Sequence, residues 1–119
     1  MIPSRGEGWG RPHIEAMAMG LPTIATNWSG NLEFMKPSNS YLIEVESLVE
    51  ITSGPFKNHK WAQPSVSHLQ SLMRNVYSDP ESAKAVGQVA KEYIRANYTP
   101  KIVGEIIFKR LMEIADKFC

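Results

Sequence analysis

Residues 4–22 decide the fold and read Ser-Arg-Gly-Glu-Gly-Trp-Gly-Arg-Pro-His-Ile-Glu-Ala-Met-Ala-Met-Gly-Leu-Pro. Three glycines alternate with Glu7 and Trp9, so this turn can adopt positive φ and let a ligand approach the main chain. Pro12 suits the first position of a helix, and Gly20 suits its left-handed end. We therefore expect a strand end, a glycine-rich turn and a short helix, with an apolar face made by Ile14, Met17, Ala18 and Leu21.

This turn offers the chemistry of an anion site. Unpaired N–H groups at the start of a helix, together with the helix dipole, favour a bound phosphate. Glu7 lies in the turn and Glu15 lies about one turn into the helix. Carboxylates accept hydrogen bonds from paired sugar hydroxyls, so one on each side of a phosphate site indicates a ligand with sugar, phosphate and sugar in a row. A nucleotide-sugar has that layout.

Each part of the pattern also has a simpler explanation. A glutamate in the first turn of a helix is more often a partner of the dipole, and tight turns need glycine in any case. Arg11 occupies the third glycine position of the dinucleotide fingerprint, which argues against a nicotinamide cofactor. No Gly-Lys-Ser/Thr follows the turn, which excludes a P-loop. The combination of turn and two carboxylates carries the hypothesis.

Residues 6–26 closely resemble the E-x7-E segment of GT-B glycosyltransferases, in the retaining, family-4-like group, and the resemblance extends through residues 28–34. It implies that Glu15 binds the ribose of the donor and that Glu7 is the catalytic carboxylate beside the donor sugar. It further implies that the turn holds the diphosphate or the sugar, through the donor-binding residues Gly8, Trp9, Gly10 and Arg11. Many relatives have a bulky apolar residue where this chain has Arg11, which either aids anion binding or is solvated.

The resemblance implies an enzyme of the hexosyltransferase type that transfers a glycosyl group with retention. Its donor would be a UDP- or GDP-sugar, with no metal or other cofactor, and its acceptor is not identified by the sequence. An alternative of a different class is a non-catalytic nucleotide- or carbohydrate-binding module, or an interaction module, derived from the same fold.

Size and composition set further expectations. The 119 residues are 43% apolar and 21% charged with a net charge of +1, which is typical of a soluble domain and gives no electrostatic case for nucleic acid. Cys119 is the single cysteine, so no internal disulfide is possible. We expect no membrane span and a cytoplasmic location. Residues 1–3 resemble a strand end, so we interpret the chain as a C-terminal piece of a GT-B enzyme, inactive alone.

The remaining pattern favours an α/β fold, a partial Rossmann-like parallel sheet followed by C-terminal helices. Residues 1–63 form the α/β part, with strands at 23–26 and 41–45, a loop at 27–31 beside the Glu7 turn, and a helical turn at 32–35. Residues 46–63 are hard to interpret: 47–52 could form an extra edge strand. The basic and aromatic run 56–61 favours a solvated loop with Trp61 packed inward over a nucleic-acid surface.

Residues 64–119 form the helical part, with helices at 64–77, 80–97 and from 100 onward. Asp79 and Thr99 each precede a proline and predict helix caps. Apolar side chains recur at helical spacing, and we expect them in the core: Val66, Leu69, Leu72, Met73 and Val76 in the first; Ala83, Val86, Ala90, Tyr93 and Ile94 in the second; Ile102, Val103, Ile106, Ile107, Leu111, Ile114 and Phe118 in the third. His13 could bond the donor, or could equally pack or cap.

Overall fold

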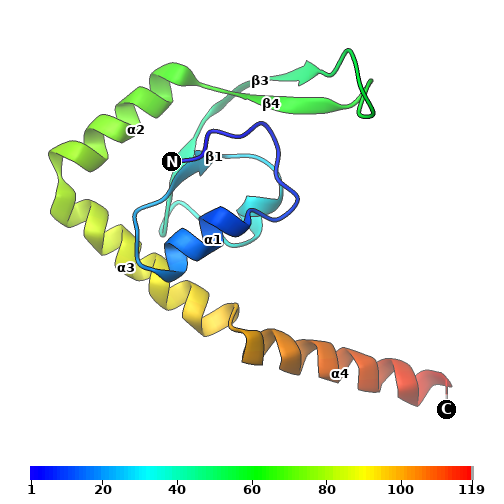
Figure 1. The fold of residues 1–119 in the computed structure, drawn as a ribbon. Coiled ribbons are helices and arrows are strands. Elements are labelled where there is room, and N and C mark those ends of the chain that lie inside the picture. Colours follow the sequence, from blue (N-terminus) through cyan, green and yellow to red (C-terminus); the bar gives the residue numbers. More distant parts are fainter. Residues whose placement is uncertain (119) are drawn as a thin grey trace.

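The computed structural model describes residues 1–118 and is shown in Figure 1. In chain order the elements are α1 (Arg11–Ala18), β1 (Ile24–Thr26), the 3-10 turn η1 (Gly30–Glu33), β2 (Tyr41–Ile43), β3 (Val45–Glu50), β4 (Lys60–Pro64), α2 (Val66–Ser78), α3 (Pro80–Asn97) and α4 (Pro100–Phe118). The Cα atoms extend over 57 × 42 × 17 Å, so the molecule is flat and elongated. Cys119, and with it the disulfide expectation, lies outside the described residues.

A small parallel sheet lies behind α1. Strands β1 and β2 pair in parallel, with Ala25 opposite Leu42. Ile2 adds a parallel bridge to Ala25, and its N–H donates to the Ile24 carbonyl at 2.9 Å. All three residues of β1 are buried, as expected for a strand enclosed in an α/β fold. The mixed α/β class and the two expected strands are confirmed.

An antiparallel hairpin of β3 and β4 extends from this body (Figure 1). The strand expected at 47–52 does form, at Val45–Glu50, but it pairs with β4 and not with the parallel sheet. The prediction of a loop over residues 56–61 was wrong for its last two residues, because Lys60 and Trp61 belong to β4. Lys60 pairs with Glu50 and Trp61 pairs with Val49 across the hairpin, and this pairing outweighs the loop-like composition of residues 56–61.

The core forms where α1 and α3 pack on the parallel sheet. It is made by Met17, Ala25, Phe34, Met35, Ala90 and Ile94. Gly87 of α3 faces the end of α1: a Cβ there would lie 2.2 Å from the Gly20 carbonyl oxygen. Gly20 has φ +79, as its position after α1 predicted. A glycine on each side therefore lets the two backbones approach closely.

Helices α3 and α4 begin at the predicted caps, whereas the helix predicted from residue 64 begins at Val66, because Pro64 belongs to β4. Asp79 accepts a hydrogen bond from the Ser82 N–H at 3.0 Å, and Thr99 accepts one from the Ile102 N–H at 3.3 Å. The predicted core stripe is correct only for α3, where Ala83, Ala90 and Ile94 are buried and Gly87 joins them. Within residues 1–118, none of the helices is both long enough and apolar enough to cross a bilayer.

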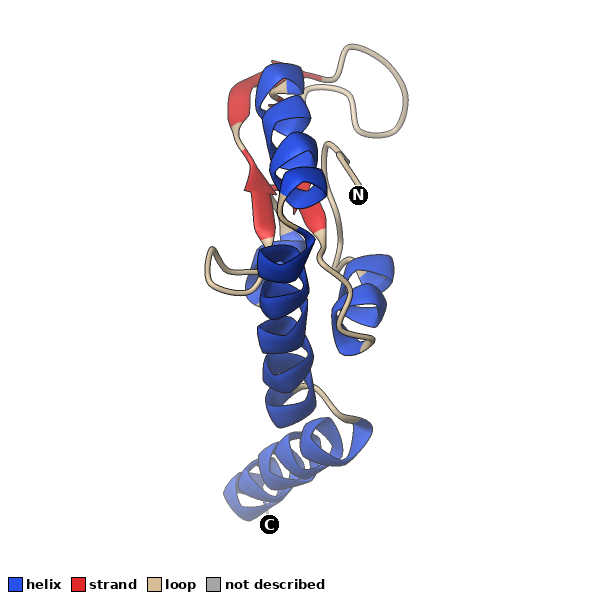
Figure 2. Ribbon diagram, turned by 90° about the vertical axis from the view of Figure 1, so that its left-hand side faces the viewer, coloured by secondary structure: helices blue, strands red, loops and turns tan. Residues whose placement is uncertain are grey.

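The predicted core faces of α2 and α4 were wrong. Neither helix has a buried residue: Val66 and Met73 of α2 are exposed, while its other stripe residues are half-buried. In α4 the exposed stripe includes Ile106, Ile107 and Phe118. Figures 1 and 2 show α4 projecting away from the body. Helical periodicity is a local property, so it specifies an apolar face without specifying what packs against it.

Candidate functional site at the glycine-rich turn

Three hydrogen bonds connect the glycine-rich turn to the loop after β1. The Ser29 hydroxyl accepts from the Glu7 N–H at 3.0 Å and donates to the Glu7 carbonyl at 2.6 Å. The Gly30 N–H donates to the same carbonyl at 3.0 Å. The prediction that residues 27–30 lie beside the Glu7 turn is confirmed. The loop follows β1, and the turn follows Ile2, which bridges to β1 in parallel. The two segments therefore meet at one edge of the sheet.

The approach of these segments leaves no room for a larger side chain at residue 30. A Cβ on Gly30 would lie 2.2 Å from the Gly8 oxygen and 2.9 Å from the Glu7 oxygen. Ser29 adopts φ +78, which is unusual for a residue with a side chain. The strained serine and the tight glycine together shape the turn.

Helix α1 begins at this turn without a side-chain cap. Gly10 precedes the helix with φ +95, and its carbonyl accepts from the N–H groups of His13 and Ile14. Within residues 1–118, the N–H groups of Gly8, Trp9, Gly10 and Arg11 donate no hydrogen bond. Successive unpaired N–H groups at a helix start attract an anion. The binding of an anion at this turn stays a prediction.

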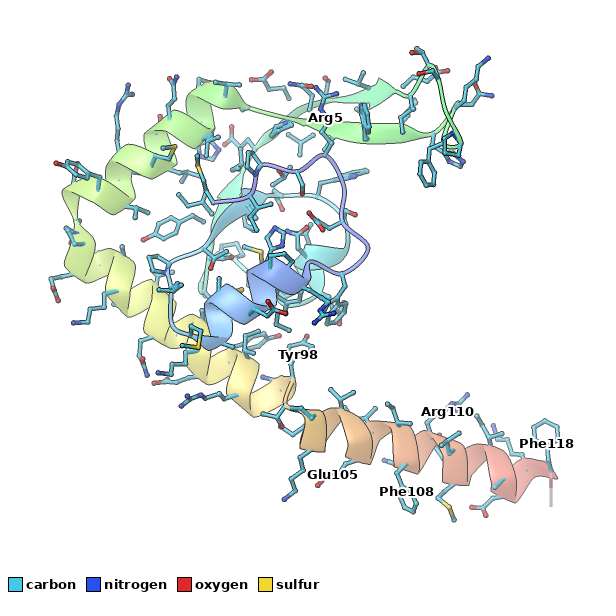
Figure 3. All side chains as sticks on the ribbon, in the orientation of Figure 1. Arg5, Tyr98, Glu105, Phe108, Arg110 and Phe118 are labelled. Carbon is cyan, nitrogen blue, oxygen red and sulfur yellow. The ribbon has the colours of Figure 1, made fainter. Side chains whose placement is uncertain are left out.

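Trp9 anchors the turn to an aromatic cluster. Its ring centroid lies 5.4 Å from that of Phe34 and 5.9 Å from that of Tyr98. The Tyr98 hydroxyl donates to the Glu33 carbonyl at 3.3 Å, and Figure 3 shows Tyr98 at the end of α3. Burial, with a contribution from Tyr93, raises the pKa of Tyr98 to about 12, so this phenol stays neutral. The cluster links the turn to α3.

A cavity of about 460 Å³ opens beside the turn, within the size range of small-molecule sites. It is lined by Gly8, Trp9, Ser29, Gly30, Leu32 and Glu33. Two predicted donor-binding residues, Gly8 and Trp9, line it, whereas Gly10 and Arg11 do not. Ser29 lies in the loop that was predicted beside the turn, but neither Ser29 nor Glu33 was named as a binding residue from the sequence. Their position after a buried strand, where parallel sheets place their ligands, was the signal that could have identified them.

The two predicted carboxylates occupy different surroundings, and neither lines this cavity. Glu7 is half-buried, and its charge is close enough to His13 to affect the pKa of that residue. Glu15 pairs with Arg11 at 3.5 Å across one helical turn, with side chains 66% and 84% exposed. An ion pair this exposed contributes little to stability, so both side chains remain available to a ligand.

Buried polar groups support the turn from beneath. His13 and Asn31 are 0% and 1% exposed. A Cβ on Gly10 would lie 2.8 Å from the His13 Nδ1 and 3.2 Å from the Asn31 Cβ, so both side chains press against the turn. Neither ring nitrogen of His13 has a hydrogen-bond partner. Burial lowers the pKa of His13, opposed by the nearby Glu7 carboxylate and Gly10 carbonyl. His13 therefore packs under the turn.

Asn31 ties the loop to β1, because its amide donates to the Thr26 carbonyl at 3.1 Å. Thr26 in turn donates from its hydroxyl to the Ser4 carbonyl at 2.6 Å. These bonds connect the N-terminal segment, β1 and η1. In residues 1–118, no group of three or more His, Cys, Asp or Glu side chains is placed to hold a metal ion.

Comparison with known proteins bears on the same segment. Residues 1–54 match the family model described as "Glycosyl transferases group 1". No curated protein and no solved structure gives a significant match. The matched residues include the glycine-rich turn, α1, β1, η1 and β2, and so contain every residue that lines the cavity beside the turn. Over this segment, the chain is similar to the group 1 glycosyltransferases. This similarity supports the transfer of glycosyl groups as the activity.

Proposed function

We propose that this chain contributes the donor-binding part of a retaining GT-B glycosyltransferase of the family-4-like group, with a nucleotide-sugar as donor. The observation that carries the proposal is the run of four unpaired N–H groups at Gly8, Trp9, Gly10 and Arg11, at the start of α1. A diphosphate would satisfy them, and the cavity lined by Gly8 and Trp9 would receive the sugar or nucleoside attached to it.

The turn would act mainly on the leaving group. Negative charge develops on the diphosphate as its bond to the sugar breaks, and oriented N–H groups with a helix dipole stabilise such charge without reorganising. The fastening of Glu7 to Ser29 and Gly30 holds these groups in place before the donor binds. Preorganisation of this kind lowers the barrier because its cost has been met during folding.

The two carboxylates would have separate roles. Glu15 would exchange its exposed pair with Arg11 for hydrogen bonds to the ribose hydroxyls, leaving Arg11 free to face the diphosphate. Glu7, half-buried beside the turn, would position the donor sugar and favour positive charge at its anomeric carbon. We propose a hexosyl donor and retention of configuration, with the acceptor brought by a further domain, so the 119 residues alone would bind without transfer.

A titration of the ¹⁵N-labelled chain with UDP, GDP and UDP-glucose tests this proposal. We expect shifts in the amides of residues 8–11 and 29–33. Glu15→Gln should weaken binding about tenfold, because a hydrogen bond to a charged group is lost. Glu105→Gln, on exposed α4, is the matched control and should bind as the parent does. Absence of shifts at residues 8–11, or equal affinity of the Glu15→Gln variant, would overturn the assignment.

A further inference from the structure

A second cavity, of about 670 Å³, lies between the N-terminal segment and the β3–β4 hairpin. It shares no residue with the cavity at the turn. It is lined by Arg5, Val49, Glu50, Ile51, Thr52, Ser53, Phe56 and Trp61. Most of these residues come from the hairpin, and Figure 3 shows Arg5 reaching toward it from the N-terminal segment. Arg5 is two residues before Glu7, so the two cavities flank the same short stretch of chain.

One wall of this hairpin cavity is built around Trp61. The Arg5 guanidinium lies over the Trp61 ring, 4.9 Å from its centroid. The Arg5 carbonyl accepts from the Ala62 N–H at 2.9 Å, which fixes the N-terminal segment against β4. Across the hairpin, Val49 is the pairing partner of Trp61. The Trp61 ring therefore contacts the Arg5 guanidinium, belongs to a strand paired with β3, and lines the cavity.

The opposite wall is an ordered loop. The Ile51 N–H donates to the His59 carbonyl at 2.8 Å, the Asn58 N–H to the Ile51 carbonyl at 2.9 Å, and the His59 N–H to the Phe56 carbonyl at 3.1 Å. These bonds close the loop on itself, and Phe56 within it is 66% exposed. An aromatic ring held in solvent by an ordered loop offers a large contact area at little entropic cost.

Polar groups in the hairpin cavity are unused by the fold. Within residues 1–118, the side chains of Arg5, Glu50, Thr52 and Ser53 form no hydrogen bond or ion pair. The Trp61 Nε1 is buried without a partner, which is uncommon for an indole N–H. The cavity thus combines two aromatic rings with one cation, one carboxylate and two hydroxyls.

We propose that the hairpin cavity binds a saccharide. A sugar ring has an apolar face of C–H groups that packs on Phe56 or Trp61, and a rim of hydroxyls that both donate and accept. Arg5 donates to such hydroxyls and Glu50 accepts from them. Arg5 and Glu50 leave the lining without net charge, which favours a neutral polyhydroxylated ligand over a phosphate-rich ligand or a nucleic acid. The evidence for this saccharide site is the hairpin cavity itself, which shares no lining residue with the cavity at the turn.

Titration of the ¹⁵N-labelled chain with maltotriose and, separately, with cellotriose tests this inference. We expect shifts in the amides of residues 49–61 and in the Trp61 indole signal, identified by its loss in Trp61→Phe. Phe56→Ala and Glu50→Gln should each weaken binding at least about fivefold, since each removes one stacking or charged contact. Phe118→Ala removes an aromatic ring from α4, where Phe118 is even more exposed than Phe56, and should leave binding unchanged.

The outcomes separate this inference from the donor proposal. Saccharide shifts at the hairpin without nucleotide shifts at residues 8–11 would retain the saccharide site and reject the donor site. Nucleotide shifts at the turn with no hairpin response to either trisaccharide would reject the saccharide site alone. Equal affinity in Phe56→Ala and the parent would also reject it, as would displacement of the trisaccharide by single-stranded RNA that shifts the same hairpin amides.

Discussion

The Ser29 hydroxyl holds both polar groups of the Glu7 backbone, accepting from the N–H at 3.0 Å and donating to the carbonyl at 2.6 Å. One side chain therefore fixes the orientation of the peptide groups on both sides of Glu7. The four unpaired N–H groups that follow belong to the same turn, so we expect the Ser29 contacts to limit their movement as well.

Ser29→Ala should lower the free energy of unfolding by about 1–2 kcal/mol, because two hydrogen bonds are lost. UDP binding should weaken as well, since the turn becomes mobile. Chemical denaturation and the NMR titration measure the two effects. Ser71→Ala, which removes a hydroxyl bonded within exposed α2, is the control and should change neither. If Ser29→Ala behaves like the control, the hydroxyl does not fix the turn.

Gly30→Ala should displace the turn, because its Cβ would meet backbone oxygens of Gly8 and Glu7 at 2.2 and 2.9 Å. We expect a loss of about 1–3 kcal/mol in the free energy of unfolding and changed amide shifts at residues 8–11. Gly8→Ala is the matched control for the stability measurement, since nothing lies within 4 Å of its Cβ. A crystal structure or spectrum of Gly30→Ala with an unmoved turn would contradict this account of the close approach.

The two helical glycines should respond in opposite directions to alanine. Gly87→Ala places a Cβ 2.2 Å from the Gly20 oxygen and should lower the free energy of unfolding by about 1–3 kcal/mol. Gly104→Ala lies in open space on α4 and should favour the helix by about 1 kcal/mol. Thermal denaturation followed by circular dichroism compares them. A stabilising Gly87→Ala would show that α1 and α3 are not closely packed there.

His13 should make folding sensitive to mild acid. Burial lowers its folded-state pKa below the ordinary value of 6.5, so the unfolded chain binds the proton more readily. The contribution to stability is complete above about pH 6.5 and is lost as pH falls through the folded-state pKa. In His13→Leu this part of the pH dependence should vanish, because leucine has no ionisable group.

Urea denaturation of the parent and of His13→Leu, from pH 7.5 down to pH 5, measures this difference. His59→Gln, in the exposed loop of the hairpin, is the control and should keep the pH profile of the parent. An unchanged acid sensitivity in His13→Leu would assign it to another group.

Local signals in the sequence predicted the elements around the turn well. Gly10 and Gly20 have the positive φ values that their positions favoured, and Asp79 and Thr99 cap the helices that follow them. The position of Ser29 beside Glu7 also followed from a general rule, that segments leaving parallel strands meet at one edge of the sheet. These features depend on residues close in sequence or on a rule of topology.

The sequence by itself thus determined the turn, the helix starts and ends, and the apolar faces. Only the tertiary structure decided which faces are covered: α3 packs on α1 through Gly87, whereas α4 extends from the body with its apolar side chains exposed. It also decided that β3 pairs with β4 and that Glu33 lines the cavity beside the turn while Glu15 pairs outward with Arg11. The physical reason is that backbone conformation and periodicity are set by neighbours along the chain, while burial and side-chain partners are set by contacts between residues far apart in sequence.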